Sequence, residues 1–305
     1  MKNWIMFGLL GLIWGSSFLL IKIGLTGLDA FSLVSGRLVF AAIAFTIFAF
    51  ITHRRLPTDR DTLIKLAIVG LTNTAIPFVL ITWGESSIDS GLAGVLDATA
   101  PLFSLLIAHL ALADEKITLG KILGLIAGFA GVIVLAMRTA DPLHPNPIIG
   151  QLAVIVASVC YGGSAVFIRR SLRKIDPLVV PWATLLFGAS VVVVLALVTV
   201  HPLPILTALE PKVILSVITL GVINTFVAYA FFFTLIQTWG ATRATTVAYL
   251  LPPVSVLLGV LVEHEPFDVQ LMIGTVMILG GVALTNLIQP RPQPMAELTS
   301  PEPLP

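Results

Sequence analysis

The sequence predicts an all-α polytopic membrane protein whose ten transmembrane helices form two inverted five-helix repeats, with the N- and C-termini in the cytoplasm. Three observations predict it: an apolar composition, ten hydrophobic runs and an internal duplication. Of the 305 residues, 57% are hydrophobic and 11% are charged, and the mean hydropathy is +1.03. A single soluble core cannot hide so much apolar surface, so we expect an integral membrane protein.

Each hydrophobic run is about 20 residues long, which is the length a helix needs to cross the hydrocarbon at about 1.5 Å per residue. The first run could be read as a secretory signal, but it continues to Leu25 and similar runs follow, which favours a retained helix. Short links rich in turn residues, such as HRRLPTDRD, leave no room for a soluble domain. The ten predicted helices cover residues 4–25, 30–52, 63–83, 90–112, 120–138, 147–168, 177–199, 212–237, 242–263 and 268–288.

The basic residues predict the orientation, because Lys and Arg in short loops are retained on the cytoplasmic side. With the N-terminus inside, thirteen of the seventeen basic residues flank the cytoplasmic ends of the helices, and three flank the outer ends. The three outer residues are Lys22, Arg138 and Lys212, and the remaining one, Arg37, falls within a helix.

An internal duplication divides the chain. The segment WGSSFLLIK at 14–22 matches YGGSAVFIR at 161–169, and GLTNT at 70–74 matches GVINT at 221–225. We therefore expect a first repeat over 1–140, a second over 141–290 and a disordered cytoplasmic tail over 291–305. Because five helices is an odd number, the second repeat enters the membrane inverted, as in many carriers that work by alternating access.

This pattern resembles the EamA-type members of the drug/metabolite transporter superfamily, and within them most resembles the amino-acid exporters. The features that carry the resemblance are WGSSF in the first helix, GRLVF with Arg37 in the second, a proline within the fourth and ninth helices, an acidic residue after each of these, and glycine-spaced fifth and tenth helices. The resemblance covers almost all of residues 4–288. The second repeat departs from it, with Tyr161 in place of Trp14 and Thr184 in place of Arg37.

Polar and aromatic residues at helical spacing are candidates for a substrate wall at the repeat interface. Asn73 and Pro77 share a helix face, and Asn224 is the repeat equivalent of Asn73. Structural alternatives remain: a serine such as Ser16 can bond its own helix backbone, and a buried Asn can bond a neighbouring helix. The candidates are Trp14, Ser16, Asn73, Pro77, Asp97, Tyr161, Ser164, Asn224, Tyr229 and Tyr249.

Pro101 and Pro252 are matched prolines in the fourth and ninth helices. A proline removes a backbone donor and kinks a helix. The pair is a candidate for two hinges, with a static kink as the alternative.

Arg37 and Asp97 should lie at matching depth, roughly 10 to 12 Å below the outer helix ends at about 1.5 Å per residue. An unpaired charge there is costly, so we expect the two either to form an ion pair or to share a zwitterionic substrate. If they form an ion pair, Asp97→Asn should partly rescue Arg37→Gln.

The remaining charged residues have plainer explanations. Lys22 and Arg169 lie near helix ends, where their side chains can reach the interface. Glu115 and Glu265 are expected to begin the fifth and tenth helices, with proton coupling as the alternative. Glycine stripes on those two helices predict close packing against a helix of this chain or of another subunit.

The sequence lacks the motifs that several classes of function require, namely those of enzymes, ATP-driven proteins and nucleic-acid-binding proteins. The histidines are isolated and no HExxH, GxSxG or Walker A sequence is present, so we expect neither an enzyme nor a metal, cofactor or ATP-driven protein. No basic run indicates nucleic acid. We expect an exporter of small molecules, foremost aromatic or other neutral amino acids. Alternatives are a multidrug exporter of lipophilic cations and a proton-coupled carrier of another neutral metabolite. One chain suffices in principle, with a dimer as the alternative.

Overall fold

The computed structural model describes residues 2–112, 117–137, 146–200 and 209–287, and within these ranges it contains helices and turns but no strand. Nine of the described helical spans are long and apolar enough to cross a membrane, and a shorter apolar helix covers Val269–Thr285. These helical spans overlap the hydrophobic runs expected from the sequence. The expected tail over 291–305, together with Glu115 and Arg138, lies outside the described residues.

The first repeat contains five spans, two of which are interrupted. Its elements are α1 (Lys2–Leu25), α2 (Ala30–Ile51), α3 (Arg60–Gly70) continued by the π-helix η1 (Leu71–Ala75) and α4 (Ile76–Glu85), α5 (Ser90–Asp97) followed by α6 (Ala100–Ala111), and α7 (Leu119–Ala136). Aspartate side chains cap the starts of α2 and α3. Asp29, for example, accepts hydrogen bonds from the backbone N–H of Phe31 (2.9 Å) and Ser32 (3.1 Å).

The second repeat has the same interruptions at equivalent places. Its elements are α8 (Ile148–Ser171), α9 (Val179–Thr199), α10 (Pro211–Gly221) continued by the π-helix η3 (Val222–Val227) and α11 (Ala228–Trp239), α12 (Ala241–Thr245) with the 3₁₀ turn η4 (Thr246–Leu250) and α13 (Leu251–Val262), and α14 (Val269–Leu287). The elements η1 and η3 each contain an Asn-Thr pair, so the duplication seen in the sequence is also a duplication of backbone irregularities.

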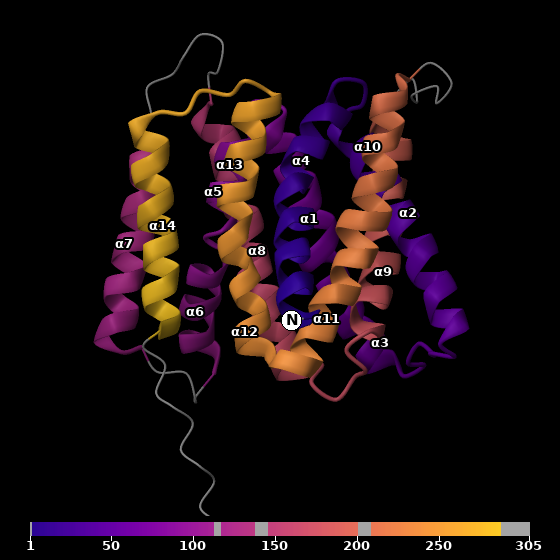
Figure 1. Cartoon of the computed structure of the whole chain (residues 1–305). Coiled ribbons are helices and arrows are strands. Elements are labelled where there is room, and N and C mark those ends of the chain that lie inside the picture. The colour runs from indigo at the N-terminus through magenta and orange to yellow at the C-terminus, as the bar shows by residue number, and fades with distance from the viewer. Residues whose placement is uncertain (1, 113–116, 138–145, 201–208, 288–305) are drawn as a thin grey trace, which may run out of the picture.

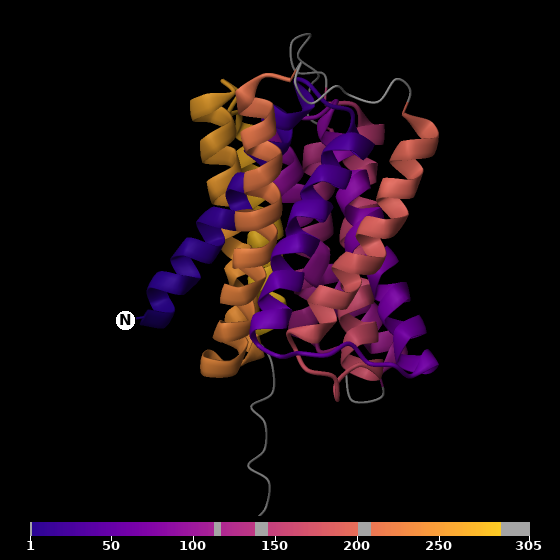
Figure 2. The same cartoon turned by 90° about the vertical axis from the view of Figure 1, so that its right-hand side faces the viewer.

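The helices stand side by side in one bundle (Figure 1), with α1 beginning and α14 ending at the same end. We call this the terminal end, and the opposite one the far end. The first turns of α1 project from the bundle (Figure 2), and Trp4 there is 68% exposed. Large apolar side chains such as Phe50, Leu110 and Val198 also point outward, as expected for a surface in contact with lipid.

The helices α7 and α14 form a tightly packed pair at one side of the bundle (Figure 1), so the glycine stripes meet within one chain. A Cβ atom at Gly281 would lie 2.5 Å from the carbonyl oxygen of Gly124 and 2.6 Å from the nitrogen of Gly128. Both neighbours are backbone atoms, which cannot turn aside as a flexible side chain can.

We therefore expect Gly281→Ala to destabilise the protein by about 1–3 kcal/mol, the usual cost of overpacking. Gly280→Ala is the matched control, because a Cβ at Gly280 meets nothing within 4 Å. Thermal unfolding in detergent, followed by tryptophan fluorescence, should show a lower Tm for Gly281→Ala alone. Equal Tm values for the two variants would contradict the packing.

Glu265 corrects one expectation from the sequence. It does not begin the tenth helix; Asp268 does, accepting from the N–H of Leu271 at 2.7 Å. The Glu265 carboxylate instead accepts from the N–H of Ser90 (2.6 Å) and of Gly91 (2.9 Å), the first residues of α5 in the other repeat. The preference of a carboxylate for a helix N-terminus holds, but the helix is one brought near only by the tertiary fold.

Candidate functional site

A cavity of about 790 Å³ lies between the two repeats, within the usual size range of small-molecule sites. Lys121 near the start of α7, Arg169 near the end of α8 and Thr285 near the end of α14 line it, and all three lie toward the terminal end. Arg37 and Asp97 line its deeper part, toward the far end. The cavity therefore extends from the middle of the bundle toward the terminal end.

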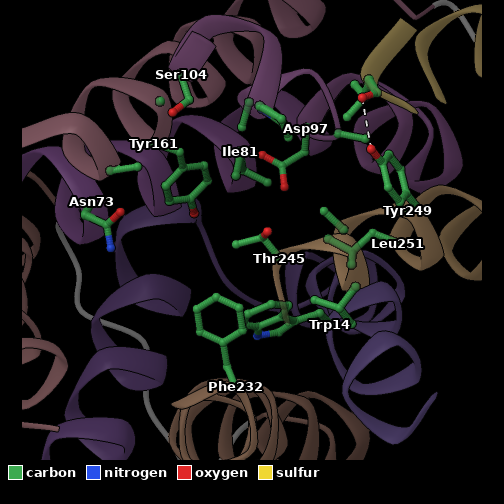
Figure 3. A pocket seen from close by; sticks show the side chains of 18 of the residues that line it. Trp14, Asn73, Ile81, Asp97, Ser104, Tyr161, Phe232, Thr245, Tyr249 and Leu251 are labelled. Carbon is green, nitrogen blue, oxygen red and sulfur yellow. Dashed lines mark hydrogen bonds between the residues drawn. The ribbon is translucent and has the colours of Figure 1, made fainter. Parts of the chain in front are cut away.

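Aromatic rings form much of its wall. Trp14 lies 5.2 Å from Phe232 and 6.4 Å from Tyr229, measured between ring centroids. Figure 3 shows Trp14 and Phe232 on one side of the cavity and Tyr161 and Asp97 on the other. Rings of this kind can pack against an apolar or aromatic substrate side chain.

Arg37 is held at the deep end of the cavity by contacts from two other spans. Its Nε donates a hydrogen bond to Thr225 Oγ1 (3.1 Å), and its Cζ lies 4.1 Å from the centroid of the Phe78 ring. Thr225 in turn donates to the carbonyl oxygen of Leu220, five residues back, as the π-helix η3 permits (2.8 Å). Among the described residues Arg37 makes no further hydrogen bond, which leaves its terminal nitrogens for a ligand.

Asp97 is the last residue of α5, where the fourth span is interrupted. Its Oδ1 is buried and has no hydrogen-bond partner among the described residues. The predicted direct ion pair with Arg37 is not formed between these two described side chains. The Arg37 guanidinium instead contacts Thr225 and Phe78, and Arg37 and Asp97 each line the cavity.

The two equivalent asparagines differ in their contacts. Asn73 lines the cavity, as Tyr229 does. Asn224, although it also reaches the cavity, donates to the carbonyl of Ile13, to Ser16 Oγ (3.2 Å) and to Ser17 Oγ (3.1 Å). Asn224 thus ties η3 to α1, which is the structural role left open by the sequence.

The π-helix η1 explains why Pro77 was misplaced. Regular helical spacing puts Asn73, Pro77 and Leu80 on one face, but a π-turn inserts an extra residue. Phe78 and Ile81 consequently line the cavity, while Pro77 is buried away from it. An α-helical projection cannot reveal such a shift.

Two predicted serines also lie outside the cavity. Ser16 donates to the carbonyl of Ile13 (2.9 Å) and lies in a shallow groove between α1 and α13, whereas its neighbour Ser17 lines the cavity. Ser164 is 2% exposed and bonds Thr72 Oγ1 at 2.8 Å. The cavity does bring together Trp14, Asn73, Asp97, Tyr161, Asn224, Tyr229 and Tyr249. Tyr249 donates to the carbonyl of Val282 at 2.9 Å (Figure 3).

Residues that the sequence did not point to include Phe78, Thr225, Phe232 and Arg169. Thr225 belongs to the repeated Asn-Thr pair, of which only the asparagine was a candidate from the sequence. Arg169 was expected at the interface, but it lines the cavity near its terminal end. Phe232 was hidden in an apolar run with no distinguishing neighbour.

The interruptions at the two prolines are real. Pro101 follows the break between α5 and α6 and lines the cavity, and Pro252 is the second residue of α13, just after η4. Pro252 itself is buried outside the cavity. At the far end α5 packs against α13, whereas α6 and η4, nearer the terminal end, both line the cavity.

Comparison with known proteins agrees with this architecture. The model of the EamA-like transporter family matches twice, over residues 2–137 and 148–287. The chain belongs to the EamA-like transporter family. The family model thus occurs in two copies, one in each half of the chain.

Relatives of this EamA-like transporter carry the names of transporters. An uncharacterized transporter of Archaeoglobus fulgidus is 30% identical, covering 92% of this chain and 98% of the relative. A probable terminal-alkyne amino-acid exporter of Streptantibioticus cattleyicolor is 27% identical over 90% of this chain and 89% of its own. The uncharacterized inner membrane transporter YedA of Escherichia coli is 27% identical, covering 90% and 88%.

A crystal structure of a protein 18% identical to this EamA-like transporter superposes with a TM-score of 0.66, covering 94% of this chain and 96% of the other. At that identity the likeness concerns the fold alone. The family, the relatives and the apolar helices together identify the chain as a multi-pass protein of the inner membrane. The relatives described above are named as transporters.

Proposed function

We propose that the protein exports amino acids with aromatic or other neutral side chains, and that Arg37 and Asp97 bind the two charges of the zwitterion. The observation that carries the proposal is one cation and one anion at the deep end of an aromatic cavity, not paired with each other. A guanidinium binds a carboxylate through parallel hydrogen bonds, and Asp97 Oδ1 is an unused acceptor for an ammonium. The amino-acid exporter among the relatives supports this substrate class.

Alternating access is the proposed mechanism. The far-end halves of the interrupted spans, α5 and α13, are in contact, while the terminal-end halves line an accessible cavity. Inverted repeats allow the opposite arrangement by exchanging the conformations of the two halves. Pro101 and Pro252, at the breaks, are the proposed hinges.

The positive residues support placing the terminal end in the cytoplasm, with both termini inside. In that orientation the structure is open to the cytoplasm and closed to the outside. This is the state in which an exporter accepts its substrate.

Counterflow in proteoliposomes tests the proposal. Vesicles preloaded with unlabelled L-phenylalanine should accumulate labelled L-phenylalanine transiently, with saturation, and empty vesicles should not. Absence of exchange for any neutral amino acid would contradict amino-acid export.

A second candidate, export of lipophilic cations, rests on the unpartnered Asp97 oxygen among the rings of Trp14, Tyr161 and Phe232. Uptake of labelled tetraphenylphosphonium by the same vesicles, without amino-acid counterflow, would favour it.

A further inference from the structure

The far end of the bundle is closed by a seam between α5 and α13. A Cβ at Gly91 would lie 3.0 Å from the Cα of Val256, and one at Gly94 would overlap Ser255. The Glu265 carboxylate closes the seam at its outer edge, accepting from two backbone N–H groups at the N-terminus of α5. Glu265 is thus a hydrogen-bonded carboxyl group at the positive end of a helix.

Glu85 lies near the same end in the opposite environment. Its side chain is 0% exposed, and neither carboxylate oxygen has a hydrogen-bond partner among the described residues. It is also the last residue of α4, where the helix dipole disfavours negative charge. An ionised carboxylate without partners is very costly in such a place, so Glu85 is a neutral carboxylic acid in this conformation.

The charged groups around Glu85 are few. The cations that interact electrostatically with Glu85 are Lys22 of α1 and Arg37 of α2. The anions that do so are Glu265 and Asp97. None of them forms an ion pair with it among the described residues. The helix α8 packs against α4 with Gly150 and Val154 next to Gly84, which adds no charge.

The inverted repeats indicate what opening the far end would expose. Phe233 lines the present cavity, and at the repeat offset its equivalent is Thr82, which does not line it and lies one turn before Glu85. Arg169 lines the present cavity as well, and its equivalent is Lys22. A cavity open to the far end would therefore reach the level of Glu85 and Lys22. The position equivalent to Glu85 in the second repeat is Ile236, so only the far end carries an acid.

We infer that Glu85 is a proton-binding site, occupied while the far end is closed and emptied to water when it opens. This inference rests on the proposed alternation between two open states. With the far end closed, Glu85 holds a proton because nothing buried with it stabilises the charge. With the far end open, water solvates the carboxylate, Lys22 stabilises it, and the proton passes to the outer solution. A proton is favoured over a metal ion, since no cluster of three or more His, Cys, Asp or Glu side chains that could hold a metal occurs among the described residues.

Linkage sets the sign of the effect. A site that binds its proton in the closed state makes opening more favourable as the pH rises, by up to about tenfold in the equilibrium constant per pH unit for one proton. Glu85→Gln mimics the neutral acid and should keep the far end closed at every pH.

The test uses the full chain in lipid, without any substrate. Spin labels on Ser86→Cys and Glu263→Cys, two exposed positions on either side of the seam, report its opening as a longer inter-label distance in a Cys160→Ala background. Glu210→Gln is the matched control, because Glu210 is exposed at the same end and pairs with Lys212 at 2.8 Å.

We expect the long-distance fraction to rise with pH in the parent and in Glu210→Gln, and to stay at its low-pH value in Glu85→Gln. A Glu85→Gln variant that titrates like the parent, or a parent whose distances ignore pH, would overturn the inference. If Glu85→Gln does not fold, the infrared carbonyl band of a protonated carboxylic acid decides instead: it should shift in Glu85→Asp, and an unchanged band overturns the inference. Failure of amino-acid counterflow would contradict the proposed substrate, but it would not affect the conclusion about proton binding at Glu85.

Discussion

Arg37→Gln is expected to weaken binding of a zwitterionic amino acid by at least ~30-fold. Removing one partner of a buried, hydrogen-bonded charge pair costs about 2–5 kcal/mol, and about 1.4 kcal/mol corresponds to a factor of ten. The guanidinium is preset for this role, since Thr225 and the Phe78 ring hold it while its terminal nitrogens remain available. Concentration dependence of L-phenylalanine counterflow measures the loss.

Two comparisons sharpen this result. Phenethylamine has no carboxylate, so its competition for the cavity should change little in Arg37→Gln. Arg55→Gln, at an exposed loop position, should behave as the parent. An equal loss for phenylalanine and phenethylamine would mean that Arg37 acts on the fold and not on the carboxylate.

Asp97→Asn is expected to produce a loss of similar size for the other end of the substrate, ~30-fold or more by the same reasoning. Its buried Oδ1 has no partner among the described residues, so an ammonium is the group that would satisfy it. The affinity for 3-phenylpropionate, which lacks the ammonium, should be unchanged or higher. Asp61→Asn is the control, because Asp61 is exposed and pairs with Lys65 on its own helix.

The same variant separates the two candidate functions. If amino-acid exchange is intact in Asp97→Asn while uptake of tetraphenylphosphonium is lost, Asp97 serves cations and the lipophilic-cation candidate is favoured. The double variant with Arg37→Gln is informative too. Because the structure contains no direct pair, we expect the two losses to multiply, and a partial rescue would contradict the separate placement of the charges.

Several features of the site were within reach of the sequence. The matched prolines marked the breaks beside Pro101 and Pro252, and the repeated Asn-Thr pairs, noted as cavity candidates, fall within the irregular segments η1 and η3. Trp14 and Tyr161, aligned by the duplication, both line the cavity. These signals come from comparing one half of the sequence with the other, so they require no knowledge of which residues pack together.

Other features depend on neighbours far along the chain. Nothing near Arg37 predicts that Thr225, 188 residues away, accepts its hydrogen bond. Glu265 caps a helix of the other repeat, 175 residues away. Pro77 and Ser16 lie outside the cavity, because a π-turn and a backbone hydrogen bond change which side chains face it.

The sequence by itself determined that this chain is a helical membrane protein made of two repeats, because apolar length and duplication are properties of the chain alone. Only the tertiary structure decided which charges remain unpaired, which face of each helix meets the cavity, and which end of the bundle is closed. Those depend on helix rotation and on contacts between the repeats. A shift of one residue in a π-turn, or a distant hydroxyl such as that of Thr225, is enough to change them.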